Sequence, residues 1–324
     1  MEEKKKRQSG LSGKLLNFAP VIGLAVMAAV FLAIASAKDV NLSYSFKNIL
    51  NQSIITMVVA TGAIYIYTLG SFDISLGASM CVSALIGAMA YNRTESLAVM
   101  LLACVGCAIG ISLVSSVLAS VFNLPVFVTT IAMLSLLNAL SLVLIKANGT
   151  GDVVQVPAPA VKGINTVWFK LLVLLLYIAV CVISFNFMKL GRQEKFMGGN
   201  PECAKLTGLS SKKLSILGFV MAGIGIGLGA FLTITYAPTL SRNTGGSVGM
   251  DVIISIVFGG MPVSGGARSK IYSAVVGSLS MTLLSQIMLM LNLNSGIGQM
   301  VKATIFILVV YVSMLNSRKS ILPR

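Results

Sequence analysis

Two aspartates lie in strongly apolar sequence and are the first candidates for chemistry. Asp73 occurs in "YTLGSFDISLGASM" (67–80), and the nearest basic residues along the chain are Lys47 and Arg93. Asp251 ends the glycine-rich stretch "RNTGGSVGMD" (242–251). Ionisable residues at membrane depth are costly and usually functional. Each aspartate is also placed to cap the helix after it, by accepting hydrogen bonds from free backbone N–H groups. The two interpretations are compatible, because a capped helix end can face a water-filled path.

Patterns typical of enzymes are present but incomplete. "GGSVG" (245–249) matches the G-x-S-x-G motif of serine hydrolases, yet the chain has no histidine to complete a triad. Cys104-x-x-Cys107 has metal or redox spacing, but no second cysteine pair accompanies it. The phosphate-binding motif G-x-x-x-x-G-K-[ST] does not occur. We therefore expect neither an enzyme nor a chain that binds a metal or cofactor itself.

The composition indicates an integral membrane protein. Of 324 residues, 56% are hydrophobic and 10% are charged, and the mean hydropathy is +0.93. Soluble domains carry about 25% charged residues. The apolar residues form runs too long for barrel strands, so the fold class is all-α and polytopic. The first run, 18–37, is also longer than a cleaved signal sequence, which predicts an uncleaved first helix.

The apolar runs divide the chain into about ten helical segments. The eighth is too short to span a bilayer alone and lies between glycine-rich stretches, which predicts a broken helix. Such backbone is tolerated at membrane depth only inside protein or beside a wet cavity. The predicted segments are 18–37, 51–69, 74–91, 97–121, 125–145, 167–187, 214–236, 250–262, 271–291 and 298–316.

The positive charges predict the orientation. The chain carries a net charge of +15, and sixteen of its 24 Lys and Arg lie in residues 1–17, 188–213, 263–270 and 317–324. This distribution is typical of cytoplasmic loops and does not require a nucleic-acid partner. Six crossings return the chain to the cytoplasm at 188–213, and four more do so at the C-terminus. We expect a cytoplasmic tail at 1–17, a transmembrane domain at 18–316 and a second cytoplasmic tail at 317–324, in a multi-pass protein of the bacterial plasma membrane.

The cytoplasmic loop 188–213 contains a short helix with clear end signals. In "GGNPECAKLTGL" (198–209), Asn200 suits the N-cap, Pro201 the first helical position and Gly208 the C-terminal stop. A helix of two turns is marginal in water by itself. Its candidate apolar stripe for a partner's groove consists of Cys203, Leu206 and Leu209. The alternative is a capped connector that lies on the membrane.

Five stretches, in order along the chain, resemble the ribose-type sugar permeases of ABC importers. They cover nearly the whole apolar part. The stretches are "FDISLGAS" (72–79), "NLPVFVTTIAM" (123–133), "GGNPECAKLTGL" (198–209), "TGGSVGMDVIISIVFGGMPVSGGARSKI" (244–271) and "QMVKATIFILVV" (299–310).

This resemblance implies a vitamin B12-importer-like (type II) ABC permease fold that works as a dimer. The partners would be a second permease copy, an ABC ATPase that binds ATP and Mg²⁺, and an extracytoplasmic solute-binding protein. The implied ATPase-coupling residues are Gly199, Asn200, Pro201, Glu202, Ala204, Leu206 and Gly208. The implied residues of the translocation path or its gates are Asp73, Ser75, Pro125, Phe127, Thr130, Asp251, Gly259 and Gly260.

Departures from the family pattern leave the solute open. Gly249-Met250 replaces the family's Tyr-Glu, and Ser71-Phe72 replaces a glycine pair. We therefore expect a sugar or sugar-like solute, with a nucleoside or polyol as the alternative cargo. The alternative class is a stand-alone secondary carrier or channel, which would transport without any ATPase.

Overall fold

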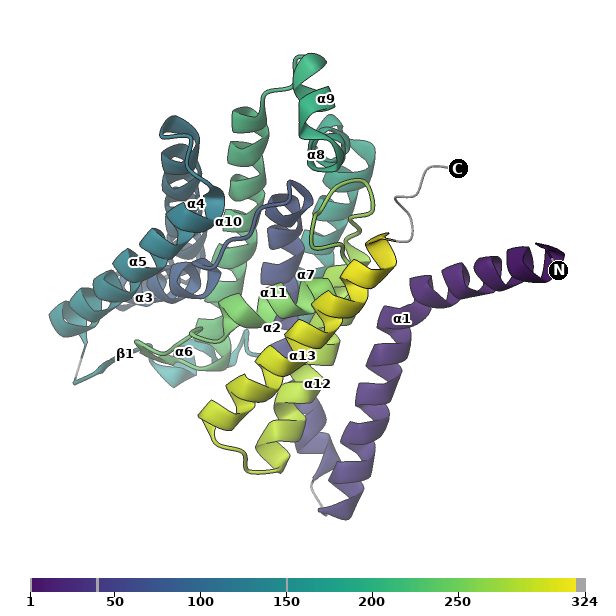
Figure 1. The fold of residues 1–324 in the computed structure, drawn as a ribbon. Helices are drawn as coiled ribbons and strands as arrows, with labels where there is room; N and C mark the ends of the chain where they lie inside the picture. Colours follow the sequence, from purple (N-terminus) through teal and green to yellow (C-terminus); the bar gives the residue numbers. More distant parts are fainter. Residues whose placement is uncertain (1, 39–40, 150, 319–324) are drawn as a thin grey trace.

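The computed structural model describes residues 2–38, 41–149 and 151–318, with side chains from 20 to 311 inside those ranges. Within them the chain is almost entirely helical (Figure 1). The elements are α1 (Glu2–Ala37), α2 (Leu42–Thr68), α3 (Leu76–Thr94), α4 (Leu97–Val121), α5 (Val126–Asn148), β1 (Val153–Gln155), α6 (Ala158–Lys162), α7 (Val167–Val182), the π-helical turn η1 (Ile183–Phe187), α8 (Lys189–Gly199), α9 (Pro201–Leu206), α10 (Ser211–Tyr236), β2 (Thr239–Ser241), α11 (Val248–Phe258), α12 (Tyr272–Met290) and α13 (Ser295–Arg318).

Each of the ten predicted segments corresponds to a helix, namely α1–α5, α7 with η1, and α10–α13. Seven helices in the described part of the chain are long and apolar enough to cross a membrane. The predicted short segment is confirmed as α11, which has only 11 residues. The all-α polytopic fold class is therefore correct. The predicted C-terminal tail lies outside the described residues from 319 onward.

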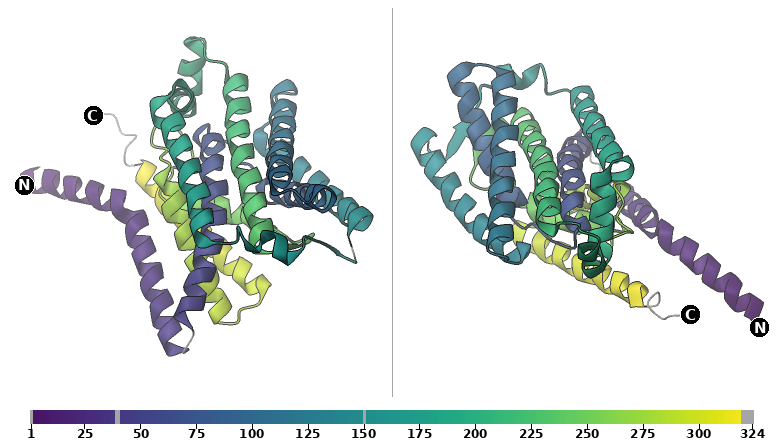
Figure 2. Two further views of the ribbon diagram at one scale, coloured as in Figure 1. Left: turned by 180° about the vertical axis from the view of Figure 1, so that it is seen from behind. Right: turned by 90° about the horizontal axis from the view of Figure 1, so that it is seen from above.

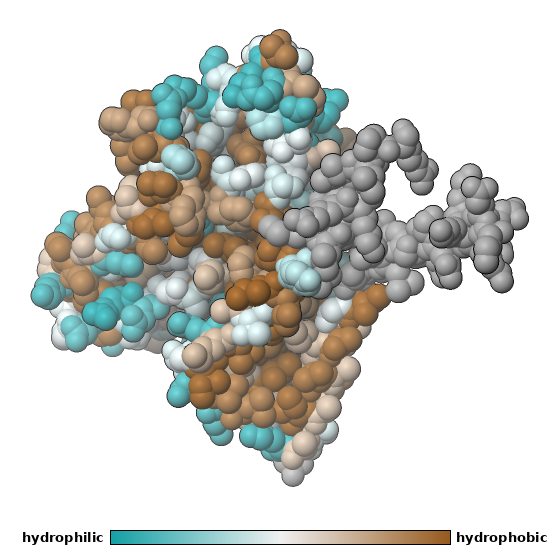
Figure 3. All heavy atoms as spheres, viewed as in Figure 1, coloured by the Kyte–Doolittle hydropathy of each residue, from teal (hydrophilic) through white to brown (hydrophobic). Residues whose placement is uncertain are grey.

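The molecule has two distinct ends. The pair α8–α9 lies at one end, whereas α6, the short β1–β2 ribbon and the α12–α13 turn lie toward the other (Figure 1). Figure 2 shows that the N-terminal part of α1 extends away from the bundle. On the face in Figure 3, hydrophilic residues gather over the α8–α9 end and hydrophobic residues cover much of the surface below it.

Two long helices, α2 and α10, form the centre of the bundle. Most of each is buried, and their glycines allow close packing on two sides. The backbone of α4 lies against Gly223 and Gly227, whereas α2 lies against Gly225 and Gly229. Glycines at this spacing let two helix backbones approach closely. At Gly106 and Gly110 of α4, by contrast, no described atom lies within 4 Å of a Cβ built at either position.

The tightest helix crossing joins the short helix α11 to α12. A Cβ at Gly277 would overlap the carbonyl oxygen of Ser255, and one at Gly259 would overlap that of Ser273. Both glycines therefore hold α11 and α12 at backbone contact. The path candidate Gly259 has this packing role in the structure, and its neighbour Gly260 (φ +88°) lies against Pro20 of α1.

We expect Gly277→Ala to destabilise the protein by about 1–3 kcal/mol, the usual penalty for overpacking a dense interior. The methyl group would press on the backbone of α11, which cannot rotate away as a side chain could. Thermal unfolding in detergent measures this loss. The matched control is Gly110→Ala, where the new methyl group meets open space. Equal stability of the two variants would contradict the backbone contact between α11 and α12 at Gly277.

Candidate functional site

The helix predicted within the loop 188–213 is present as α9. The Asn200 side chain accepts a hydrogen bond from the Cys203 N–H at 3.1 Å, and Pro201 occupies the first helical position. At the other end Gly208 has φ +80°, and its N–H donates to the Lys205 carbonyl at 2.9 Å. Glu202 pairs with Lys205 one turn later at 2.9 Å. These local signals define the helix, as the sequence indicates.

The two faces of α9 differ sharply in burial. Ala204 is fully buried and packs with Met197 and Leu214, whereas Leu206 is 89% exposed. The predicted stripe of Cys203, Leu206 and Leu209 is wrong in one member, because Leu209 is half-buried and packs inward on the same cluster. Its N–H bonds to the Ala204 carbonyl, which turns the chain back toward the bundle. The outward face therefore presents Leu206 and Cys203.

The C-terminal end of α8, which leads into α9, packs directly against backbone. A Cβ at Gly198 would overlap the carbonyl oxygen of Thr68, the last residue of α2. That same carbonyl accepts a hydrogen bond from the N–H of Gly266 at 2.9 Å, and Gly266 also lies against Gly199. The end of α8, the end of α2 and the loop 259–271 thus meet at one point with no side chain between them. A displacement of α8–α9 must therefore also move the end of α2 and the loop 259–271.

Glu194 of α8 is a buried acid that the sequence analysis missed. It is fully buried, and neither carboxylate oxygen has a hydrogen-bond partner among the described residues. Its Oε1 lies close to Gly218 of α10. Burial raises the pKa of Glu194 to about 9, and the neighbouring charge of Lys195 opposes this only in part. In the sequence Glu194 looks like a solvated residue of "GRQEK", so no local signal distinguishes it.

Asp73 lies in the turn between α2 and α3 and is buried. Its carboxylate accepts the N–H of Ser75 at 2.8 Å and the Ser75 hydroxyl at 2.7 Å. The predicted cap is wrong, because Ser75 rather than Asp73 is the N-cap of α3 and, among the described residues, no side chain caps this helix. Asp73 instead closes the turn onto the N-cap residue. Thr130 of α5 bonds to the same turn, where its hydroxyl accepts the N–H of Ile74 at 3.4 Å.

The structure thus brings Asp73, Ser75 and Thr130 together, but it separates them from two other path candidates. Pro125 is exposed at the start of α5, and Phe127 is 50% exposed. Neither lines either of the two hollows described below.

Asp251 does not cap α11, so that interpretation is wrong. It is the fourth residue of the helix, and its carboxylate forms an ion pair with Lys302 of α13 at 2.7 Å. Only 16% of the Asp251 side chain and 14% of the Lys302 side chain are exposed. Tertiary pairing replaces the local interaction, because a carboxylate one turn into a helix no longer reaches the free N–H groups. A lysine within the apolar stretch "QMVKATIFILVV" (299–310) was the available signal for the partner.

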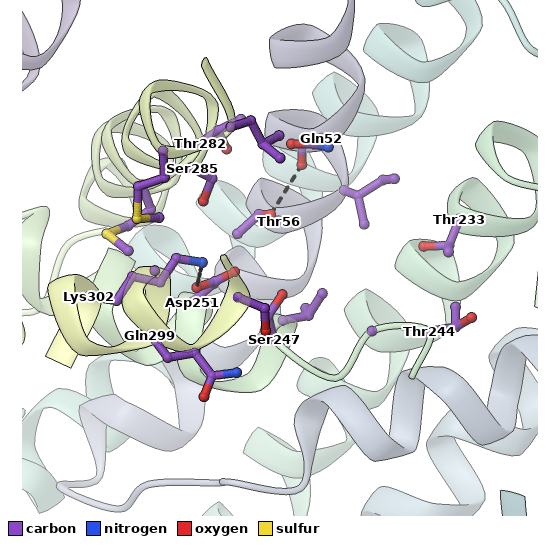
Figure 4. Close-up of a pocket in the computed structure, with 18 of the residues that line it drawn as sticks. Gln52, Thr56, Thr233, Thr244, Ser247, Asp251, Thr282, Ser285, Gln299 and Lys302 are labelled. Atoms are coloured by element: carbon purple, nitrogen blue, oxygen red, sulfur yellow. Dashed lines mark hydrogen bonds and ion pairs between the residues drawn. The ribbon is translucent and has the colours of Figure 1, made fainter. Parts of the chain in front are cut away.

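The ion pair borders a hollow of about 600 Å³ between α2, α10, α11, α12 and α13, which we call the polar hollow (Figure 4). It opens near the end of the molecule opposite α9, where Tyr236 and the α12–α13 turn line it. Among its lining residues are the hydroxyl and amide side chains of Gln52, Thr56, Thr233, Thr244, Ser247, Thr282, Ser285, Asn294 and Gln299. Of the path candidates, Asp251 alone lines it.

A second hollow of about 620 Å³ lies between α3, α5 and the loop 242–250. Thr244 lines both hollows, so this loop forms a wall between them. Where the loop enters α11 it lies against the start of α3, since a Cβ at Gly77 would be 2.5 Å from the Gly245 carbonyl and 3.1 Å from the Gly249 nitrogen. The first turns of α3 and α11 therefore meet beside the wall.

Comparison with known proteins gives a consistent result. The family model described as branched-chain amino acid transport system / permease component matches residues 45–310. A probable ABC transporter permease protein of Escherichia coli (strain K12) is 29% identical over 212 residues, which cover 62% of this chain and 60% of that protein.

Two relatives align over more of their length. The ribose import permease protein of Escherichia coli (strain K12) is 22% identical, with 82% of this chain and 84% of that protein covered. The galactose/methyl galactoside import permease protein of Haemophilus influenzae (strain ATCC 51907 / DSM 11121 / KW20 / Rd) is 25% identical, with 90% and 93% covered. No solved structure matches the chain.

Proposed function

Because the chain belongs to the family of branched-chain amino acid transport system permease components, we propose that it is the membrane-spanning subunit of an ABC importer for a sugar or sugar-like solute. The alignments with ribose and galactose import permeases over more than four fifths of the chain support this solute class. The subunit forms the path through the membrane. ATP and Mg²⁺ bind to a separate ATPase chain, and an extracytoplasmic binding protein delivers the solute.

The observation that carries this proposal is the shape of α9. A helix of six residues is too short to persist alone, yet it is capped at both ends and anchored by Ala204 while Leu206 points away from the bundle. Such a projection fits a groove on a partner protein. The many basic residues of 188–213 support a cytoplasmic position for it, on the side of the membrane where an ATPase acts. We assign the contact to the exposed residues of the predicted coupling segment 199–208, around Leu206, whereas the buried Ala204 anchors α9 to its own subunit.

The backbone junction at Gly198 supplies a route for the motion. When the ATPase moves α8–α9, the end of α2 and the loop 259–271 move with them, because they touch at Gly198 and Gly266 without an intervening side chain. That loop follows directly after the last residue of α11, a helix whose first turn, at its other end, carries Asp251 at the polar hollow. Rigid-body rocking of a second permease copy in the opposite sense would complete the gate.

ATP dependence separates this function from a stand-alone secondary carrier or channel. Proteoliposomes that contain the permease, its ATPase and its binding protein should accumulate labelled D-galactose or D-ribose only when ATP is supplied on the ATPase side of the membrane. Uptake at the same rate with a non-hydrolysable ATP analogue, or without the ATPase, would contradict the proposal and favour the carrier.

Leu206→Asp should weaken the ATPase–permease complex by about tenfold or more, because an exposed apolar anchor at the centre of an interface usually contributes over 1 kcal/mol. Co-purification in detergent and fluorescence titration of the isolated ATPase measure the loss. The matched control is Leu42→Asp, the same change at a half-exposed leucine that begins α2. If Leu206→Asp binds the ATPase as the unchanged chain does, α9 is not the docking helix.

A further inference from the structure

The polar hollow combines uncharged hydrogen-bonding groups with a single ion pair. Thr56 of α2, Ser285 of α12 and Ser247 just before α11 lie around Asp251 and Lys302, so that side chains from separate helices face one space (Figure 4). Its volume of about 600 Å³ falls in the range of about 300–1,000 Å³ that small-molecule sites occupy. The arrangement is unusual for a bundle this apolar.

The ion pair keeps spare hydrogen-bonding capacity. Asp251 uses one oxygen to accept from Lys302 at 2.7 Å. A carboxylate offers about four lone-pair sites and an ammonium group three N–H donors, so both partners can bind a further group without separating. A hydroxyl group both donates and accepts, and it can therefore bond to either member of the pair.

We infer that the polar hollow binds one uncharged polyhydroxylated solute at a time, and that the Asp251–Lys302 pair makes it select against charged solutes. The inference rests on the proposed function, which it deepens by naming the solute's charge and the residues that sense it. Neither sign of charge is favoured, because the two opposite charges cancel at 2.7 Å. A charged solute loses its hydration without gaining a free counter-charge, whereas a sugar replaces its water by the surrounding hydroxyl and amide groups.

Removal of one member of the pair should change the selectivity in a predictable direction. Asp251→Asn leaves the Lys302 ammonium without its partner and should admit an anionic sugar. Lys302→Met leaves the Asp251 carboxylate and should admit a cationic one. An unpaired charge at this degree of burial should alter relative binding of a charged solute by about tenfold or more.

Saturation-transfer-difference NMR on the purified permease tests this without the binding protein, because the method detects weak ligands directly. The probes are D-galactose (neutral), D-galacturonate (anion) and D-glucosamine under mildly acidic conditions (cation). The unchanged chain should transfer saturation to galactose only. The Asp251→Asn variant should gain galacturonate, and Lys302→Met should gain glucosamine.

Two double variants serve as controls. Charge reversal, Asp251→Lys with Lys302→Asp, keeps the site neutral and should return selectivity to galactose. The uncharged pair, Asp251→Asn with Lys302→Met, should bind neither charged probe. If a single variant fails to fold, these two and the other single variant still decide the question.

The inference is overturned if the unchanged chain gives no signal with galactose, or if every variant loses galactose alike without gaining a charged probe. The latter outcome means that the pair only holds α13 in place. Either result leaves ATP-driven uptake untouched as the separate test of the proposed function.

Discussion

Gly198→Ala should lower ATP-driven uptake by roughly 5–150-fold, the range over which typical coupling energies act, while binding of the ATPase persists. A Cβ at this position would overlap the carbonyl oxygen of Thr68, which already accepts the Gly266 N–H at 2.9 Å. The methyl group must push the end of α8 off the end of α2. The docking face around Leu206 lies on the next helix and is not altered. Motion of α9 then no longer reaches α2 and the loop 259–271 directly.

Three measurements distinguish a loss of coupling from a loss of ATPase binding. Uptake into proteoliposomes should fall, ATPase activity should lose its stimulation by the loaded binding protein, and co-purification with the ATPase should stay intact. The matched control is Gly106→Ala, also a glycine within a helix, because no described atom lies within 4 Å of its Cβ. Full uptake in Gly198→Ala would show that the motion of the ATPase is transmitted to the transmembrane helices through another contact.

Glu194→Gln should stabilise the protein at neutral pH, although it removes a charged residue type from a polar loop. Burial raises the pKa of Glu194 to about 9, from 4.5 in an exposed carboxyl group. The folded state therefore holds a proton that the unfolded chain has released at pH 7. Taking up this proton lowers the free energy of unfolding by about 1.4 kcal/mol for each pH unit between 4.5 and 7, or roughly 3–4 kcal/mol in total.

The direction of the pH dependence of stability follows from the raised pKa of Glu194. Stability that Glu194 contributes in its protonated form is fully present below pH 4.5 and is lost progressively as the pH rises toward 9. The substituted glutamine side chain does not titrate, so the difference between variant and unchanged chain should be smallest near pH 4.5 and grow up to about pH 9. Burial lowers the pKa of Lys195 and the charge of Glu194 opposes this, so the variant also removes an influence on the pKa of Lys195.

Denaturant unfolding in detergent across this pH range measures the effect. Glu194→Asp is a useful control, because it keeps the titrating group while it shortens the side chain beside Gly218, and it should retain the pH slope. If the free energy of unfolding of the glutamine variant changes with pH as steeply as that of the unchanged chain, Glu194 is ionised and hydrated in the folded protein.

Some features were predictable because their causes are local. The membrane class and the ten helices follow from long apolar runs, and the short α11 follows from the length of its own run. The caps of α9 were readable at Asn200 and Gly208. In each case the physical cause lies within a few residues of its effect.

Other features required the tertiary structure, because they depend on how helices cross. Asp251 looks like a cap in the sequence, but its partner is Lys302, which lies 51 residues later on another helix. Leu209 continues an apolar stripe in the sequence, yet the turn at Gly208 directs it inward.

Burial likewise became visible only in three dimensions. Glu194 belongs to a charged stretch that reads as solvated, yet it is fully buried and its carboxylate lies close to Gly218 of α10. Local spacing specifies where a helix begins, how long it is and which residues share a face. It does not specify which face of another helix packs there, and that packing places Lys302 against Asp251, Thr68 against Gly198 and no partner against Glu194 among the described residues.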